Sequence, residues 1–314
     1  MKTEIGGYFQ LELNDGKLYH ENALKLNLGR SAFEYLLRIS DCKKIYLPSY
    51  VCDTVLLPLR KLSVDYEFYN IDENLQPIFG KELKPDEVFY YVNFFGLKNS
   101  FIRNGIKFER TIIDNAHAFF EFPVKNFDTV YSVRKFFGTP DGAFLYTQNK
   151  KRLELPRGMS HGVAQHLLVR TDAGAEAGYE IFRNNENLFE NYEVTEMSSL
   201  TEAILRNVNY ANVKRKRAEN FLFLHERLAK TNELKLEISD GIAPLCYPYL
   251  IENSSSLRKK LIENKVYLPV YWREVLARDE SSDFEKYLAK NLLPLPIDQR
   301  YGKEEMKFVL RLIK

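Results

Sequence analysis

The sequence has few cysteines and no long apolar run. These two features argue against a disulfide-rich protein and against a membrane-spanning protein. Cys42, Cys52 and Cys246 are scattered among 314 residues without a CxxC pair. They offer neither a disulfide framework nor a cysteine metal site, which fits a reducing compartment. No apolar run approaches the ~18 residues of a membrane span, and the first residues lack the apolar region of a signal peptide. We therefore expect a cytoplasmic protein without a membrane partner.

The sequence also has no large excess of positive or negative charge. Lysine and arginine total 45 and aspartate and glutamate 43, so the net charge is only +2. This balance gives no electrostatic reason to expect binding to nucleic acid or to an anionic membrane. Hydrophobic residues make up 45% of a chain that is long enough for one large domain or two of ordinary size.

Strand-like and helical segments alternate in the first half of the chain. The strand-like segments span residues 44–47, 64–72, 87–96, 110–114, 128–132 and 143–147. Such alternation is typical of βαβ units and a mainly parallel sheet that is covered on both faces. We predict an α/β fold with a large domain in residues 1–185 and a smaller C-terminal α+β domain in residues 186–314.

The second half has a different pattern. Residues 155–174 are loop-rich, and residues 196–230 have the spacing of one long amphipathic helix, with Ser199 and Glu202 as a capping box. We expect the basic cluster at residues 214–217 on the solvated face of that helix. A further helix at 255–264 and a strand at 265–270 are predicted before the terminal helix.

One helix begins directly after a glycine, near residues 29–31. Ser31 and Glu34 match the capping-box pattern. A helix N-terminus offers free backbone N–H groups and the positive end of a dipole, and both bind anions. Arg30 could add positive charge, although an ordinary capped helix without a ligand is the simpler interpretation of this segment alone.

Polar side chains follow three of the strands. Asn93, Asp114 and Lys135 all lie at or just beyond strand ends, where ligands of parallel sheets collect. Lys135 is preceded by Ser132 and followed by a turn rich in glycine and proline. We expect its amine to be partly desolvated and therefore nucleophilic near neutral pH. The best-known use of such an amine is a Schiff base to pyridoxal phosphate (PLP), whereas a solvated surface lysine is the plain alternative.

Three segments together resemble the DegT/DnrJ/StrS-type sugar aminotransferases, which have the aspartate-aminotransferase fold of PLP enzymes. They are LGRSA at 28–32, IDNAHA at 113–118, and SVRK at 132–135 followed by DGA at 141–143. Weaker similarity continues in KRKRAENF at 214–221 and NLLPLP at 291–296. The resemblance implies a seven-stranded-type sheet flanked by helices in the large domain.

The resemblance also implies roles for individual residues. Asp114 would pair with the pyridine nitrogen and keep it protonated. Lys135 would form the Schiff base and then move a proton between the substrate α-carbon and the cofactor. His117 would lie against the ring or reach its phenolic oxygen. The phosphate would be held at Gly29, Arg30, Ser31 and Ser132.

One point of the predicted cofactor site stays open. Either Tyr50 or Cys52 would cover the other face of the ring, and Asn93 would complete the site. No metal site is expected, because His161 and His166 have no carboxylate or cysteine to complete a ligand set.

The implied function is transfer of an amino group from an amino-acid donor, glutamate, to a keto-sugar nucleotide in polysaccharide biosynthesis. The resemblance implies a homodimer in which both subunits build each site. The aromatic residues Tyr267, Tyr271 and Trp272 are candidates for that interface or for the core. Two alternatives stay open: a PLP-dependent dehydratase or other lyase on the same scaffold, and a non-catalytic binding protein with the PLP fold.

Overall fold

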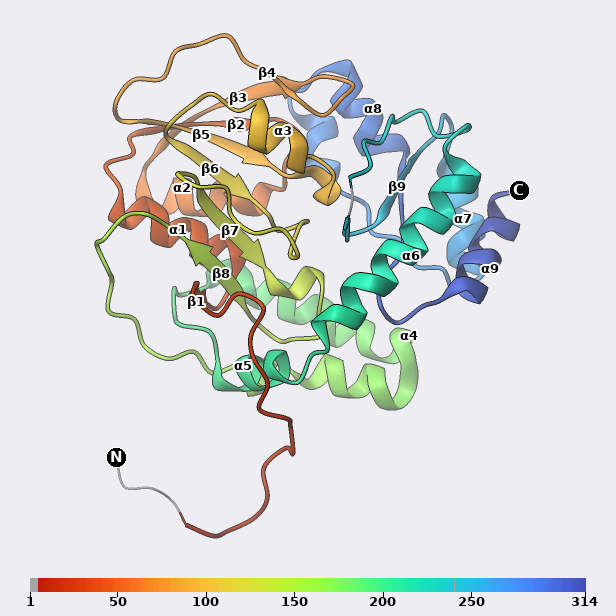
Figure 1. The fold of residues 1–314 in the computed structure, drawn as a ribbon, viewed down its shortest axis with the longest axis horizontal. Coiled ribbons are helices and arrows are strands. Elements are labelled where there is room, and N and C mark those ends of the chain that lie inside the picture. The colour runs from red at the N-terminus through yellow and green to blue at the C-terminus, as the bar shows by residue number, and fades with distance from the viewer. Residues whose placement is uncertain (1–4, 240) are drawn as a thin grey trace.

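The centre of the molecule is an eight-stranded sheet (Figure 1) in a computed structural model that describes residues 5–239 and 241–314. The strand order is β1-β8-β7-β6-β5-β2-β3-β4. The strands are β1 (Leu24–Leu26), β2 (Lys44–Pro48), β3 (Asp65–Ile71), β4 (Pro77–Ile78), β5 (Glu87–Val92), β6 (Thr111–Asp114), β7 (Asp128–Ser132) and β8 (Ala143–Tyr146).

The five strands β3, β2, β5, β6 and β7 are parallel, whereas β8, β1 and β4 join them through antiparallel pairs. The predicted α/β fold with a mainly parallel sheet is confirmed. The sheet has eight strands because the two-residue β4 pairs with β3 at its edge. All six residues of β5 are buried, as expected for a central strand with both faces covered.

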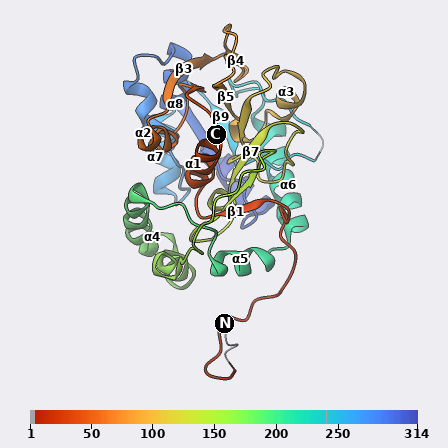
Figure 2. The same cartoon turned by 90° about the vertical axis from the view of Figure 1, so that its left-hand side faces the viewer.

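Helices cover both faces of this sheet (Figure 2). Helix α1 (Gly29–Ile39) packs against one face, where the rings of Phe33 and Tyr90 lie 5.0 Å apart. Helix α3 (Asn99–Asn104) packs against the other, where Phe101 and Tyr91 are 5.3 Å apart. Successive side chains of β5 point to opposite faces, so the neighbours Tyr90 and Tyr91 separate the two layers.

The C-terminal part forms a smaller α+β unit around the antiparallel pair β9 (Tyr247–Leu250) and β10 (Leu292–Leu295). Its buried residues are continuous with the core of the large sheet. The division at residues 185 and 186 stays a prediction. The remaining helices are α2 (Leu56–Leu62), α4 (Gln165–Leu188), α5 (Ser199–Arg206), α6 (Tyr210–Leu228), α7 (Ser255–Glu263), α8 (Asp283–Asn291) and α9 (Lys303–Ile313).

Four predictions for the second half, including the capping box at Ser199 and Glu202, are wrong. The long helix is divided into α5 and α6, because the side chain of Asn209 caps a new helix by accepting a hydrogen bond from the Asn212 amide. Residues 265–270 form no strand, and α4 begins inside the segment predicted to be loop-rich. The N-cap of α5 is Ser198, whose hydroxyl accepts from the Thr201 amide.

The basic cluster at residues 214–217 is only partly solvated. Arg215 is exposed and pairs with Glu219, one turn further along α6. Arg217, in contrast, is only 1% exposed. The prediction of a solvated basic face is therefore wrong for Arg217, because this side chain donates to the carbonyls of Pro244 and Leu245. None of the helices in the part of the chain that is described is both long and apolar enough to cross a membrane.

Candidate active site

The carboxylate of Asp114 marks the candidate site, at the carboxyl end of β6. One of its oxygens accepts a hydrogen bond from the Tyr90 hydroxyl at 2.8 Å, and the other accepts from the Ala116 amide at 2.8 Å. Burial raises the pKa of Asp114, whereas these two hydrogen bonds and the positive charge of Lys135 oppose the rise. The carboxylate is thus held in one orientation beside a lysine.

Lys135 ends a short 3-10 helix, Val133–Lys135, that directly follows β7. Its charge acts on the pKa values of Asp114 and His117, after the larger effect of burial, so the ammonium lies near both groups. The side chain itself is exposed. The expected partial desolvation is therefore absent in the chain alone. Its amine is open to a ligand.

His117 is buried on the same side of the site, at 3% exposure. Its Nδ1 accepts a hydrogen bond from the Phe95 amide at 3.3 Å. Burial, with a smaller contribution from the charge of Lys135, lowers the pKa of His117 to about 3. The ring is neutral at physiological pH, and because Nδ1 is an acceptor, its proton is on Nε2. His117 can thus offer one hydrogen-bond donor, the Nε2–H group.

Two aromatic residues with left-handed backbone conformations contact His117. Trp272 has φ +57° and its ring is stacked on the imidazole, with centroids 5.7 Å apart and planes 5° apart. Phe95 has φ +58° and donates the hydrogen bond to Nδ1. Large side chains rarely adopt this conformation, and it concentrates at functional sites. From the sequence alone, Trp272 is a candidate only for the core or a subunit interface, since no local pattern predicts a positive φ there.

The N-terminus of α1 lies against the end of β7. A Cβ atom on Gly29 would lie 3.5 Å from Cβ of Ser132, and the first N–H groups of a helix have no partner within it. The hydroxyl of Ser31 is buried and has no hydrogen-bond partner among the residues described. The predicted capping box is absent, because Ser31 lies inside the helix and Glu34 instead pairs with Arg38, Lys61 and Tyr192.

Arg30 contributes its backbone to this helix start, but its side chain points elsewhere. The guanidinium donates to the Phe189 carbonyl at 3.1 Å and lies 5.7 Å from the centre of the Tyr192 ring. Burial lowers the pKa of Arg30. The side chain therefore holds the segment after α4, and the expected anion contact reduces to the backbone N–H group.

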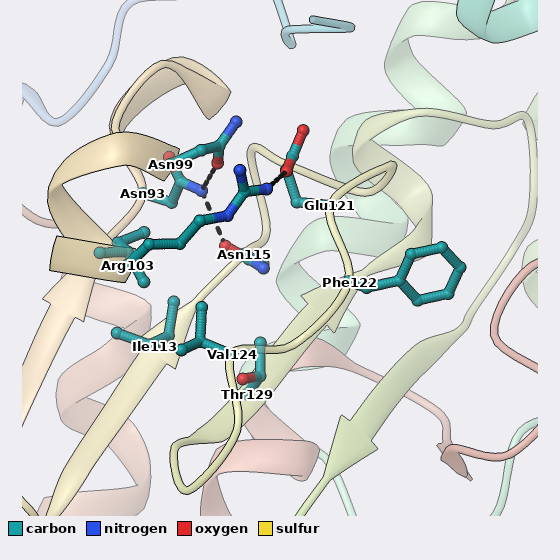
Figure 3. Close-up of a pocket in the computed structure, with 10 residues that line it drawn as sticks. Asn93, Asn99, Arg103, Ile113, Asn115, Glu121, Phe122, Val124 and Thr129 are labelled. Carbon is teal, nitrogen blue, oxygen red and sulfur yellow. Dashed lines mark hydrogen bonds and ion pairs between the residues drawn. The ribbon is translucent and has the colours of Figure 1, made fainter. Parts of the chain in front are cut away.

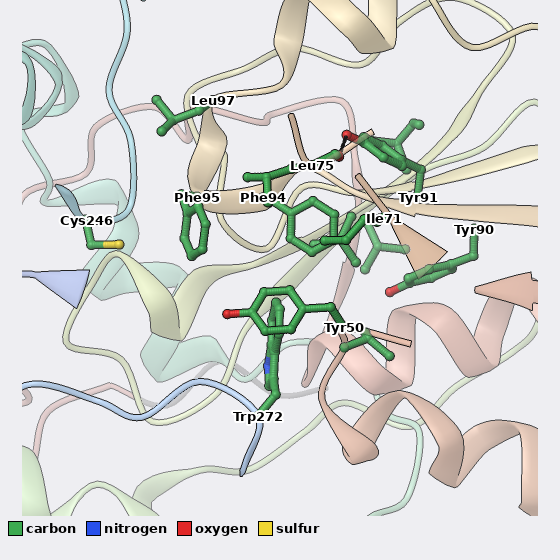
Figure 4. Packing of buried hydrophobic residues seen from close by; sticks show 14 of the residues in the cluster. Tyr50, Ile71, Leu75, Tyr90, Tyr91, Phe94, Phe95, Leu97, Cys246 and Trp272 are labelled. Atoms are coloured by element: carbon green, nitrogen blue, oxygen red, sulfur yellow. Dashed lines mark hydrogen bonds between the residues drawn. The ribbon is translucent and has the colours of Figure 1, made fainter. Parts of the chain in front are cut away.

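Tyr50 and Cys52 occupy different environments. Tyr50 is fully buried, and its ring meets Trp272 edge to face with centroids 4.6 Å apart (Figure 4). Cys52 is half-buried near the Tyr90 hydroxyl. Burial raises the pKa of Tyr90, and Asp114 and then Cys52 add to the rise. Of the two candidates for covering a cofactor ring, Cys52 lies on the side of Asp114, whereas Tyr50 is enclosed with Trp272.

The predicted site residue Asn93 lies beside Asn99 and Asn115 (Figure 3). Its amide donates to the side-chain oxygens of Asn99 at 2.7 Å and Asn115 at 2.9 Å. Its own oxygen accepts from the Lys98 amide at 3.0 Å. Because side chains alternate along a strand, Asn93 and Asn115 lie on one face of the sheet and Asp114 lies on the other. The structure does not bring Asn93 to the candidate site.

Comparison with known proteins gives matches only at the level of the fold. The sequence matches no family model and no curated protein. A sugar aminotransferase from Micromonospora echinospora superposes with a TM-score of 0.61 at 12% identity, over 93% of this chain and 86% of the other. A DegT/DnrJ/EryC1/StrS aminotransferase from Brucella abortus gives 0.59 at 13%, over 93% and 84%. NtdA from Bacillus subtilis with bound cofactor PMP gives 0.62 at 14%, over 93% and 73%.

The chain has the fold of the sugar aminotransferases. The resemblance inferred from the three motifs is thereby confirmed for the fold. Within this aminotransferase fold, Asp114, His117, Ser132 and Lys135 meet near the N-terminus of α1, at the carboxyl edge of the parallel strands. This edge is where parallel sheets bind their ligands.

The buried, neutral His117 makes the aminotransferase fold sensitive to acid. The unfolded chain takes up a proton on this residue near its ordinary pKa of about 6.5, whereas the folded chain does so only at about pH 3. Between these values the unfolded state holds more protons, so the free energy of unfolding should fall as the pH falls. The contribution of one histidine is up to about 1.4 kcal/mol per pH unit.

His117→Asn should remove that contribution. Urea unfolding followed by circular dichroism between about pH 4 and pH 6 should show a shallower dependence in the variant than in the wild type. His161→Asn, which replaces an exposed histidine, is the control. An unchanged slope in His117→Asn would contradict the buried neutral state.

Proposed function

We propose that the chain is a PLP-dependent aminotransferase that transfers an amino group from an amino-acid donor, glutamate, to a keto-sugar nucleotide. The observation that carries this proposal is the convergence of Asp114, His117 and Lys135 beside a helix N-terminus, where the buried Ser31 hydroxyl has no partner among residues 5–239 and 241–314. The fold supports it, since the solved structures that share this fold include sugar aminotransferases and one with bound PMP.

The residues present fit each polar group of PLP. The phosphate requires donors, which the first turn of α1, the Ser31 hydroxyl and the Ser132 hydroxyl offer. The pyridine nitrogen requires a carboxylate, which is Asp114. The phenolic oxygen requires a donor, and the Nε2–H group of His117 is one. The aldehyde carbon requires an amine, which is the exposed Lys135.

When bound, PLP supplies an electron sink next to the substrate α-carbon. Asp114 would keep the pyridine nitrogen protonated, since a neighbouring opposite charge favours the charged forms of both groups. That pairing also offsets the burial that raises the pKa of the Asp114 carboxyl in the chain alone. Lys135 would hold the cofactor through its amine and would serve as the base for the proton at the substrate α-carbon. The hydrogen bonds from the Tyr90 hydroxyl and the Ala116 amide hold the Asp114 carboxylate in one orientation.

The proposal extends to a cytoplasmic homodimer that acts in polysaccharide biosynthesis. An apolar segment near the N-terminus is available for a contact between copies, because Tyr8 is 99% and Phe9 93% exposed. Tyr267 is 44% exposed and donates to Glu176, whereas Trp272 is buried at the site. Of the three aromatic interface candidates, Trp272 thus belongs to the core.

Ser31→Ala should separate cofactor binding from stability. The hydroxyl has no partner in the described structure, so the free energy of unfolding should change by less than about 0.5 kcal/mol. A hydrogen bond to a charged group contributes about 1.5–3 kcal/mol, so the Kd for PLP should rise about tenfold or more. Fluorescence titration with PLP and thermal unfolding measure the two quantities. Ser254→Ala, which removes another buried hydroxyl without a partner, is the matched control and should leave the PLP Kd unchanged.

The proposed function is tested by an absorbance spectrum of the purified protein with PLP, before and after borohydride, followed by addition of glutamate. A visible band that borohydride abolishes, and that glutamate converts to the amine form of the cofactor with release of 2-oxoglutarate, supports an aminotransferase. A reducible band that no amino acid converts favours a dehydratase or other lyase. The absence of any band at saturating PLP contradicts the enzyme proposal and favours a binding protein.

A further inference from the structure

Arg217 of α6 is a fully buried cation, and none of the ion pairs identified in the described residues includes it. Burial lowers the pKa of its guanidinium to about 10, so it stays charged at neutral pH. Desolvating such a charge is unfavourable unless strong hydrogen bonds replace water. The partners of Arg217 are instead backbone carbonyls and one side-chain amide, and they belong to segments next to the candidate site.

The first of these segments carries Lys135. The carbonyl of Phe136, the next residue, lies 3.5 Å from an Nη of Arg217 and accepts from the Gln299 amide at 2.8 Å. The guanidinium also lies 4.4 Å from the centre of the Phe136 ring. Gln299 in turn accepts from Nε of Arg217 at 3.1 Å. These contacts fix the end of the turn that begins at Val133, whose carbonyl accepts from the Phe136 amide.

The second segment leads to His117. The other Nη of Arg217 donates to the carbonyls of Pro244 and Leu245, both at 3.1 Å. The Leu245 amide donates to the Phe95 carbonyl at 3.0 Å. The Phe95 amide then donates to Nδ1 of His117. A continuous chain of hydrogen bonds therefore runs from the guanidinium to the imidazole.

We propose that Arg217 is a positioning residue that fixes Lys135 and His117 relative to each other through these two backbone connections. A planar guanidinium with five donors can hold carbonyls in several directions at once, which the point charge of a lysine cannot do. The inference rests on the proposed function only for the identity of the ligand. The connection itself is a property of the chain without cofactor.

The connection predicts two local effects of Arg217→Met. Amide hydrogen exchange, measured without cofactor, should become about tenfold faster in both the 133–137 and the 94–97 peptides, the change expected from losing one hydrogen bond. Borohydride trapping of PLP on Lys135 should slow about tenfold or more, with a shifted pH profile. Arg215→Met, an exposed arginine on the same helix, should change neither quantity.

Gln299→Leu tests the connection to the Lys135 segment separately from the connection to His117. It also provides a test if Arg217→Met fails to fold. Gln299 contacts the Phe136 carbonyl directly, so this variant should speed exchange in 133–137 and slow trapping, while 94–97 stays protected. A folded Arg217→Met with wild-type exchange in either peptide, or with wild-type trapping, overturns the proposal. Wild-type exchange at 133–137 in Gln299→Leu overturns it as well. If the wild type itself traps no PLP, the proposed function fails, and the exchange data still decide the role of Arg217.

Discussion

Lys135→Ala should abolish the borohydride-stable attachment of PLP and lower kcat/KM for amino transfer by at least about 10³-fold. The variant loses both the amine that anchors the cofactor and the group that moves the proton at the α-carbon, and proton transfer alone contributes about 10²–10⁴-fold. Because Lys135 is exposed, its truncation should leave the thermal transition unchanged. Intact-mass spectrometry after reduction and a coupled glutamate assay measure the two losses.

The control for this result is Lys125→Ala, in the loop before β7. Lys125 is also an exposed lysine, but it does not follow the strand end that carries Ser132. It should keep full attachment and full activity. A mass increase of one reduced cofactor that persists in Lys135→Ala would place the covalent bond on another lysine. The assignment of Lys135 would then be wrong even if the protein is an aminotransferase.

Asp114→Asn should lower kcat/KM by about 10²-fold or more without destabilising the fold. A neighbouring opposite charge shifts a pKa by about 1–3 units, so removing the carboxylate lowers the protonated fraction of a pyridine nitrogen by about 10 to 10³. The folded chain should tolerate the change, since burial already raises the pKa of Asp114 and a neutral amide avoids that desolvation. Steady-state kinetics and thermal unfolding measure the two effects.

Asp128→Asn is the matched control for this pair of measurements. Burial also raises the pKa of Asp128, but this residue begins β7, at the far end of the strand from Ser132. Its replacement should therefore affect stability in the same direction and leave kcat/KM intact. Wild-type kcat/KM in Asp114→Asn would contradict a pyridine nitrogen that depends on this carboxylate.

The mainly parallel sheet could be predicted because each of its strands is indicated by a short run of neighbouring residues. Continuous apolar runs such as the one in β5 indicate strands with both faces covered, and a polar residue directly after such a run must lie near the edge of the sheet. Asp114 and Lys135 were found in this way, and the motif around Gly29 and Ser31 added the helix N-terminus. Each of these predictions depends on a few neighbouring residues.

The face of the sheet on which a side chain lies could not be predicted from neighbouring residues. Alternation along a strand relates Asn93 to its neighbours, but which face meets α1 and which meets α3 is set by packing between distant segments. Asn93 was therefore predicted for the site and lies with Asn99 and Asn115 instead. The same limit applies to Tyr50, whose packing against Trp272, more than 200 residues away, is visible only in the structure.

The sequence alone thus indicated the α/β class and the polar residues Asp114 and Lys135 after the strands, and the family resemblance added His117. Only the tertiary structure decided that Trp272 and Phe95 flank His117 and that Arg217 is buried against the backbone beside Lys135. The reason is physical. Hydrophobic periodicity specifies which residues are buried within one element, whereas a positive φ or a buried guanidinium is stabilised by contacts between elements far apart in the chain.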